Sequence, residues 1–224
     1  MLKHLKRRGR PTPKLEHSRL DALVDGVYSV ALTLLILNLN IPDGLSADQL
    51  AAFWPDFAPK ALSFVLSFVM AASAWIYVHQ MSALYTHTNL GHTVRTVASL
   101  MLVCALPLTT AAVGAYPNLP IGPALYAGNI MVLVAIYTLD LALSRKTLIP
   151  AEVDPKLVNQ ILLAHAGAVI WAAFCCFYLS YRNPHWGIAG IVAYVVMHWI
   201  SIWWFEPQMH IARAAIEEKR ATAK

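Results

Sequence analysis

The chain has 224 residues, of which 58% are hydrophobic and only 13% are charged, and its mean hydropathy is +0.54. A soluble domain of this length would not tolerate that composition, so an ordinary water-soluble protein is excluded. The net charge of +5 could suit a nucleic-acid binder, but no aromatic interleaving or recognition fold accompanies the basic residues, and nucleic acid is not an expected partner.

Six apolar stretches reach the length of about 20 residues that a helix needs to cross a bilayer. They run approximately over residues 20–40, 59–83, 96–116, 119–142, 157–181 and 186–205. Because they are continuously apolar and do not alternate with a period of two, they predict helices and not barrel strands. We therefore expect an all-α integral membrane protein in three parts: a basic arm (1–18), a six-helix membrane domain (19–205) and a tail (206–224).

The basic residues predict the orientation of these spans. With the N-terminus inside the cell, 15 of the 17 Lys and Arg residues fall on the cytoplasmic side, and only Lys60 and Arg182 fall outside. An excess of positive charge on cytoplasmic loops is the usual topology signal of membrane proteins. The sequence thus predicts a multi-pass protein of the cell membrane with both termini cytoplasmic.

The first span carries Asp25 well inside its length. An ionised Asp at the centre of a membrane helix costs about 2.5–3.5 kcal/mol, so it usually marks a functional site or a buried partner. At about 100° per residue, Asp25 projects about 140° away from Val30. The same geometry places a hydroxyl and three aliphatic side chains on or beside one face: Val30, Thr33, Leu34 and Leu37. This pattern fits a pore-lining helix, and it fits equally an ordinary packed helix whose Asp25 makes a structural hydrogen bond.

No pattern in the chain predicts an enzyme. The nine histidines show no HExxH or paired spacing, and the sequence contains no Gly-rich phosphate loop and no Gly-x-Ser-x-Gly elbow. Histidines scattered through membrane helices more often pack or lie at interfaces than bind metals. We expect no catalytic residue, no cofactor and no resident metal.

Three motifs in the first half of the chain stand out: Arg19-x5-Asp25-Gly26 with the residues after it, Trp75 through His79, and Leu106-Pro107. Together they resemble the transmembrane protein 175 family of potassium channels. The family's first helix typically begins Arg-x3-Phe-Ser-Asp and continues into an Ala-Ile-x-x-Thr run, and here Arg19-x5-Asp25-Gly26 is followed by Val30 and Thr33-Leu34-Leu35. Trp75 through His79 is similar to the family's second helix, and Leu106-Pro107 to its third. The second half matches only in hydropathy.

The resemblance implies a homotetramer of six-helix subunits in which the first helix of each subunit lines a central pore. This is not the ordinary potassium-channel fold, and the chain has no Thr-Val-Gly-Tyr-Gly filter. Carried over by position, the resemblance implies a constriction with Val30 as its tightest layer and Leu34 and Leu37 as further layers. It also implies that Thr33 supplies the hydroxyl linked to selectivity. A polar network bracing the pore helix is implied at Arg19, Asp25, Trp75 and His79.

Three positions depart from the family pattern. The Phe-Ser-Asp triplet is Leu23-Val24-Asp25, so the serine contact is missing. Val30 stands where Ile or Leu is usual, which predicts looser discrimination between cations. Val78 occupies the place where the family often has histidine, which leaves only His79.

We therefore expect a potassium-permeable cation channel that selects by an aliphatic constriction, with potassium bound only in transit. The alternative is a proton-coupled or small-solute transporter in which Asp25, His79 and Asp140 form a relay, although the chain lacks the internal repeats common in transporters. A membrane scaffold is a third possibility.

Overall fold

The computed structural model describes residues 17–44 and 46–222, and every regular element in these ranges is helical. The predicted arm is outside the described residues except for its last two positions. Along the chain the elements are α1 (His17–Leu34), the 3-10 turn η1 (Leu35–Asn38), α2 (Ala47–Ser82), α3 (Leu90–Ala115), α4 (Ile121–Ser144), α5 (Pro155–Phe174), the π-helical η2 (Cys175–Leu179), α6 (Ser180–Arg182) and α7 (Pro184–Thr222).

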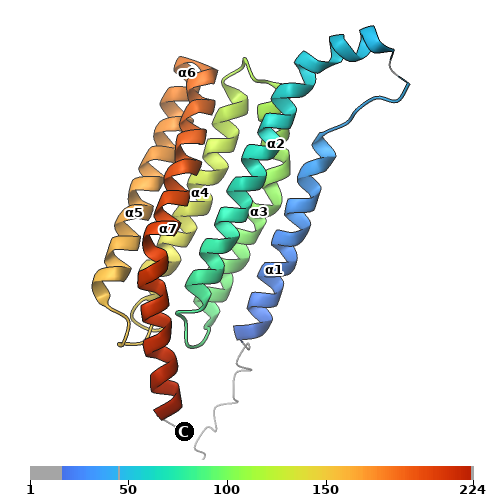
Figure 1. The fold of residues 1–224 in the computed structure, drawn as a ribbon. Helices are drawn as coiled ribbons and strands as arrows, with labels where there is room; N and C mark the ends of the chain where they lie inside the picture. The colour runs from blue at the N-terminus through green and yellow to red at the C-terminus, as the bar shows by residue number, and fades with distance from the viewer. Residues whose placement is uncertain (1–16, 45, 223–224) are drawn as a thin grey trace, which may run out of the picture.

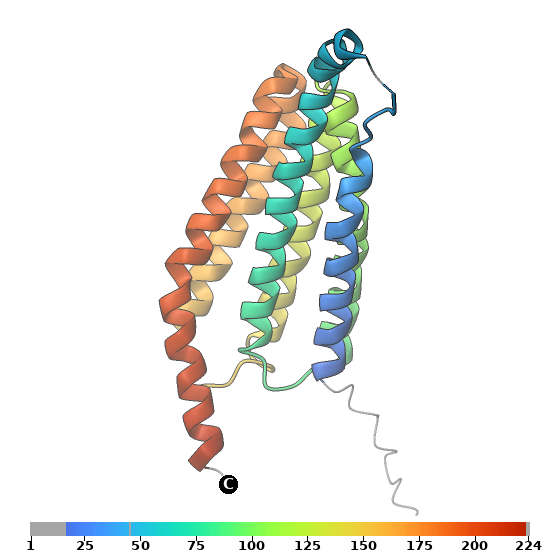
Figure 2. The ribbon, with the colours of Figure 1, turned by 45° about the vertical axis from the view of Figure 1, so that its right-hand side comes forward.

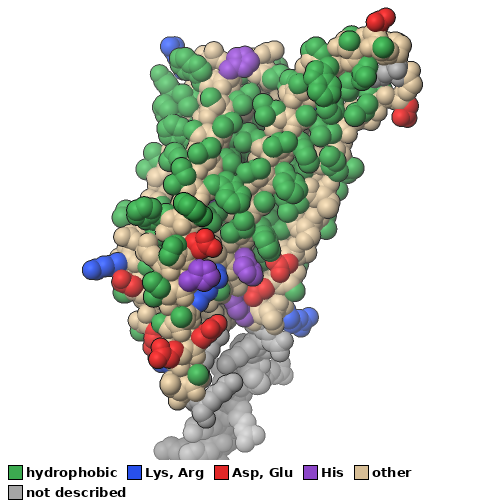
Figure 3. All heavy atoms as spheres, viewed as in Figure 1, with side chains coloured by type: hydrophobic (Ala, Val, Ile, Leu, Met, Phe, Trp, Pro, Cys, Tyr) green, Lys and Arg blue, Asp and Glu red, His purple; other side chains and the backbone are tan. Residues whose placement is uncertain are grey.

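The described part of the chain has six helices that are long and apolar enough to cross a membrane, which confirms the predicted number. Apolar side chains cover the middle of the bundle, and charged side chains gather mainly near the end where the C-terminus lies (Figure 3). One boundary differs clearly, because the second helix begins at Ala47, twelve residues before the predicted start at Pro59. Pro55 and Pro59 lie inside this helix, and its first turns bend away from the bundle (Figure 1).

Capping residues explain where three of the helices begin. The Ser46 hydroxyl accepts from the Gln49 backbone N–H, while the Gln49 side chain accepts from the Ser46 N–H, which forms a capping box for α2. The Asn89 side chain accepts from the His92 N–H at the start of α3. Asp154 caps α5, whose first residue is Pro155. These side chains satisfy backbone donors that have no partner within the helix.

The helices stand side by side with α1 at one edge of the bundle and α5 and α7 at the opposite edge (Figures 1 and 2). Within the described chain, α1 packs on α2 and α3 and reaches neither α5 nor α7. The interior between them is filled by large buried side chains, among them Tyr28, Met70, Leu106, Tyr126 and Leu133. The pore-type helix of the sequence analysis thus lies at one edge of the bundle, where it contacts only α2 and α3 among the long helices of the described chain.

Small residues let α2 and α3 approach closely. A Cβ added at Gly114 would lie 2.9 Å from the Ser63 Oγ and 3.1 Å from the Lys60 Cα, so no larger residue fits without a shift. Near this contact, the buried Thr110 hydroxyl donates to Ser67 at 2.7 Å. Close approach at small residues, with hydroxyls bonded across the interface, is the usual packing of membrane helices.

The last helix is longer than the predicted sixth span. α7 runs without a break past Pro207 to Thr222, so the predicted boundary between residues 205 and 206 falls inside a helix. Its final turns bury Met209, Ala212 and Ile216 against the start of α5. Lys219 also forms an ion pair with Glu152 in the loop before α5.

Candidate functional site

The α1 helix buries one face and leaves the opposite face open. Four residues of α1 and the first residue of η1 are at most 6% exposed and pack toward α2 and α3: Leu20, Val24, Tyr28, Ala31 and Leu35. The opposite face exposes side chains that the sequence analysis assigned to a constriction: Val30 (57%), Leu34 (42%) and, in the adjoining η1, Leu37 (71%). A row of exposed aliphatics is expected to contact lipid or another protein chain.

The hydroxyl of Thr33 lies beside this row. It donates to the backbone carbonyl of Val30 at 2.8 Å, so it is bonded within its own helix. One turn later the helix tightens into η1, where the Asn38 side chain donates to the Pro107 carbonyl at 3.0 Å. This bond fixes the far end of the exposed row to α3.

Asp25 projects toward α2, where the indole of Trp75 donates from Nε1 to its Oδ1 at 2.8 Å. The Trp75 ring in turn stacks on the ring of His79, with centroids 5.6 Å apart. Three of the four residues assigned to the bracing network therefore lie together. Arg19 is exposed, and within the described chain no hydrogen bond or ion pair joins it to them.

A second polar contact between α1 and α2 was missed by the sequence analysis. Ser82 donates to Asp21 Oδ1 at 2.7 Å, and His17 Nε2 lies 3.7 Å from the other Asp21 oxygen. His17, Asp21 and Asp25 follow one another at intervals of four residues and therefore form one row on the helix. The four-residue spacing of these polar residues was the sequence pattern that could have predicted the contact. The row gives α1 a polar edge toward α2.

We expect Asp25→Ala to weaken folding or assembly and to leave ion preference nearly unchanged, because the carboxylate accepts from Trp75 on α2 and points away from the aliphatic row. The loss of one hydrogen bond of this kind costs about 0.5–1.5 kcal/mol. Thermal unfolding of Asp25→Ala, Trp75→Phe and the double variant checks this, since the double variant should lose less than the sum of the two single changes. Normal assembly with reversed selectivity would instead place Asp25 in the conduction path.

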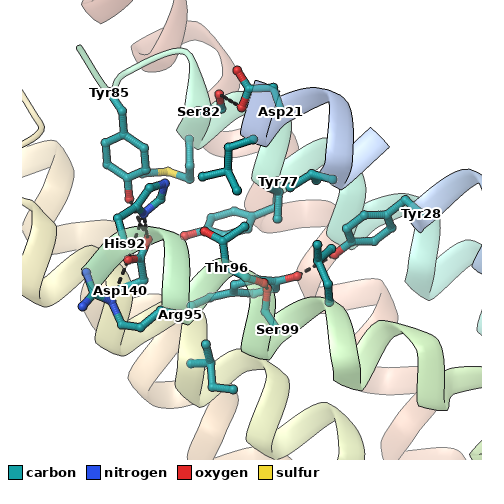
Figure 4. Close-up of a pocket in the computed structure, with 17 residues that line it drawn as sticks. Asp21, Tyr28, Tyr77, Ser82, Tyr85, His92, Arg95, Thr96, Ser99 and Asp140 are labelled. Carbon is teal, nitrogen blue, oxygen red and sulfur yellow. Dashed lines mark hydrogen bonds and ion pairs between the residues drawn. The ribbon is translucent and has the colours of Figure 1, made fainter. Parts of the chain in front are cut away.

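The most extensive polar group lies between α3 and α4 (Figure 4). The Nε of Arg95 donates to Asp140 Oδ1 at 2.8 Å, and His92 Nδ1 lies 2.9 Å from Asp140 Oδ2. Arg95 Nη2 also donates to the Ser144 hydroxyl at 3.0 Å. The side chains of His92, Arg95 and Asp140 are only 8%, 18% and 13% exposed. This cluster is a largely buried, hydrogen-bonded ion pair inside the helix bundle.

A small cavity of about 40 Å³ adjoins the cluster and reaches the base of α1 (Figure 4). Tyr85 contributes its hydroxyl from the α2–α3 loop, 3.4 Å from Asp140. Burial raises the pKa of Tyr85 above its ordinary value, and the negative charge of Asp140 adds to this effect. Tyr85 therefore stays protonated and can donate to the carboxylate.

The cluster changes two expectations from the sequence. Arg95 was counted as a topology-setting cytoplasmic charge, but its guanidinium pairs with Asp140 inside the bundle. Asp140 was considered as a relay partner of Asp25 and His79, yet within the described chain no hydrogen bond links it to either residue. Asp140 instead joins α3 to α4.

The comparisons with known proteins agree with the motifs of the first half. Residues 19–107 match the family model described as the endosomal/lysosomal potassium channel TMEM175. A protein named as a potassium channel from Chamaesiphon minutus is 28% identical over 132 residues, which cover 54% of this chain and 63% of the relative. Another protein named as a potassium channel, from Streptomyces collinus, is 32% identical over 105 residues, which cover 45% of this chain and 49% of the relative. The alignments thus span about half to two thirds of these relatives.

The fold extends the likeness over the rest of the chain. The crystal structure of a lysosomal potassium-selective channel TMEM175 homologue from Chamaesiphon minutus superposes with a TM-score of 0.71 at 21% identity, covering 83% of this chain and 97% of that one. At that identity the match shows a shared fold. Residues 19–107 thus match the TMEM175 family model, and most of this multi-pass membrane protein shares the fold of a TMEM175 homologue.

Proposed function

We propose that the chain is one subunit of a potassium-permeable cation channel whose conduction path is lined by α1. The observation that carries the proposal is the aliphatic row Val30, Leu34 and Leu37, which is exposed on the face of α1 that no other helix of the described chain covers. The names of the two relatives as potassium channels support the same activity. We assign the protein no enzymatic role and no cofactor.

The proposed channel is a homotetramer. A single helix cannot enclose a path for ions, so the open face of α1 must meet copies of itself. Fourfold symmetry around one axis would turn each residue of the row into a ring of four identical side chains. The row would then be buried at the centre of the assembly, which accounts for its exposure in the single subunit.

Selection in this channel depends on the cost of removing water from the ion. Aliphatic side chains offer no oxygen ligands, so an ion in the constriction keeps part of its water or loses it without replacement, and that loss is expensive. Potassium and caesium hold water less tightly than sodium, so they pass at lower cost. The Val30 ring is the narrowest layer in this proposal, Leu34 and Leu37 form further layers, and Thr33 supplies the adjacent hydroxyl.

We place the channel in the cell membrane with both termini in the cytoplasm. The first described residue of α1 and the end of α7 lie at the same end of the bundle, as six crossings require (Figure 1). With Arg95 left out because it pairs with Asp140 in the bundle, 14 of the other 16 Lys and Arg residues support the cytoplasm as that side. Asp25, Trp75, His79 and Arg19 would brace the pore helix near this end.

The assembly state tests the proposal. We expect the purified chain in mild detergent to have the mass of four copies by native mass spectrometry, and cross-linking to trap species up to the tetramer. A monomer that is stable at micromolar concentration, with no higher species trapped in membranes, would contradict the channel.

A further inference from the structure

A groove lies between α5 and α7, the two helices at the edge of the bundle opposite α1 (Figures 1 and 2). Its volume is about 580 Å³, which is within the range of small-molecule sites. Most of its lining is apolar, including Leu163, Ile170, Trp171, Phe174 and Met197, and no charged side chain lines it. The groove opens where a membrane-spanning bundle would face lipid.

The groove exists because α7 touches η2, which continues α5, at one end and α5 itself at the other, and the helices separate between these contacts. At Gly190 the helices are so close that an added Cβ would lie 2.6 Å from the Cys175 Sγ. Nearer the other end, Leu157 and Ile161 pack against Met209 in a shared apolar cluster. Between these contacts, a Cβ added at Gly167 would meet nothing within 4 Å. The groove is therefore closed at both ends by contacts between the helices.

Two buried polar groups in the lining have no partner. His165 is 7% exposed and Tyr194 is 4% exposed, and within the described chain the His165 Nδ1 and the Tyr194 hydroxyl make no hydrogen bond. The Nε2 of His198, which also lines the groove, is unpartnered too. Buried polar groups are nearly always satisfied, and leaving one unsatisfied costs about 1–3 kcal/mol. These atoms call for a hydrogen-bonding group from outside the chain.

We propose that the α5–α7 groove binds a neutral amphiphile with an apolar body and a single hydroxyl head. The apolar walls take the body, and the hydroxyl, which both donates and accepts, binds among His165, Tyr194 and His198. A phospholipid fits less well, because no Lys or Arg lines the groove to bind phosphate. His165 also lies about 15 Å along α5, near the middle of the membrane and away from the headgroups.

Photolabelling of the full chain in lipid nanodiscs tests the site. The probe is 1-octanol with a diazirine on its chain, and the comparison probe is the matching octane without the hydroxyl. We expect the alcohol to label peptides of α5 and α7 around Ile170 and Met197, and excess unlabelled octanol to abolish this labelling. Labelling that is spread over all lipid-facing helices and is not displaced by octanol would overturn the proposal, and this measurement needs no variant.

Two substitutions of Gly167 distinguish the effect of filling the groove from the effect of removing the glycine. Gly167→Leu places a side chain in the open space, and we expect it to lower labelling of the groove about tenfold, equivalent to about 1.4 kcal/mol. Gly167→Ala adds only the Cβ, and we expect labelling within about twofold of the native chain on the same scale. Unchanged labelling in a folded Gly167→Leu protein would contradict the site.

A third variant tests the polar anchor. His165→Phe keeps an aromatic ring and removes both ring nitrogens, so we expect labelling by the alcohol to fall about fivefold, equivalent to about 1 kcal/mol, while labelling by the alkane stays the same. An equal effect on both probes would show that His165 contributes only shape. The potassium flux of these variants is a separate readout, so failure of this site would leave the proposed channel untouched.

Discussion

Val30→Asn is expected to lower the preference for potassium over sodium about fivefold, which corresponds to about 1 kcal/mol of discrimination. In the proposed tetramer Val30 forms the narrowest ring, and an amide at each of four positions would supply hydrogen bonds that let a hydrated sodium ion pass. Val30→Ala should widen the ring and raise conductance, with a smaller loss of preference. Bi-ionic reversal potentials of the reconstituted variants measure both effects.

A valine on the opposite face of the same helix provides the matched control. Val24 is 6% exposed and packs in the core, so Val24→Ala should cost about 1–3 kcal/mol of stability by leaving a cavity, with no change in ion preference. If Val30 merely packed against a neighbouring helix, Val30→Ala would behave in the same way as Val24→Ala. Unaltered permeability ratios in well-folded Val30→Ala and Val30→Asn channels would remove Val30 from the filter.

Arg95→Met should be the most destabilising single change considered for this chain. It removes the guanidinium from Asp140, whose side chain is 13% exposed, and leaves that carboxylate with a smaller set of partners inside the bundle. Breaking a buried ion pair by removing one member typically costs about 3–5 kcal/mol. The midpoint of unfolding by denaturant in detergent measures the loss.

Another arginine shows what an exposed charge contributes. The guanidinium of Arg145 donates to Asn159 Oδ1 at the surface, at 2.9 Å, so Arg145→Met should change stability by only about 0.5 kcal/mol. The pair of variants has the same chemistry and differs in burial. Equal stability of the two variants would mean that the Asp140 cluster does not hold α3 to α4.

The six membrane helices were predictable because each depends only on the local length of an apolar run. The start of α2 was not predictable, because Pro59 resembles a boundary, whereas Ser46 and Gln49 cap the helix about three turns earlier. Proline inside a membrane helix is tolerated, since its neighbours satisfy the freed backbone groups.

The candidate site was predictable only in part, because local sequence patterns do not show which distant residues meet in the fold. The exposed row of α1 follows from helical periodicity, so Val30, Leu34 and Leu37 could be grouped from the sequence. The pairing of Asp25 with Trp75 joins residues 50 positions apart and came only from the family resemblance. The cluster of Arg95 with Asp140 joins residues 45 positions apart, and no local pattern distinguishes that arginine from one that sets topology.

Flux through vesicles containing the purified native chain tests the central claim most directly. With an outward gradient of potassium, caesium or sodium and no other driving solute, the proposed channel predicts rapid, passive and non-saturating flux, faster for potassium and caesium than for sodium. Flux that saturates and requires a proton gradient would indicate the transporter. No flux above that of empty vesicles, from a protein that is folded and tetrameric, would contradict a conduction path along α1.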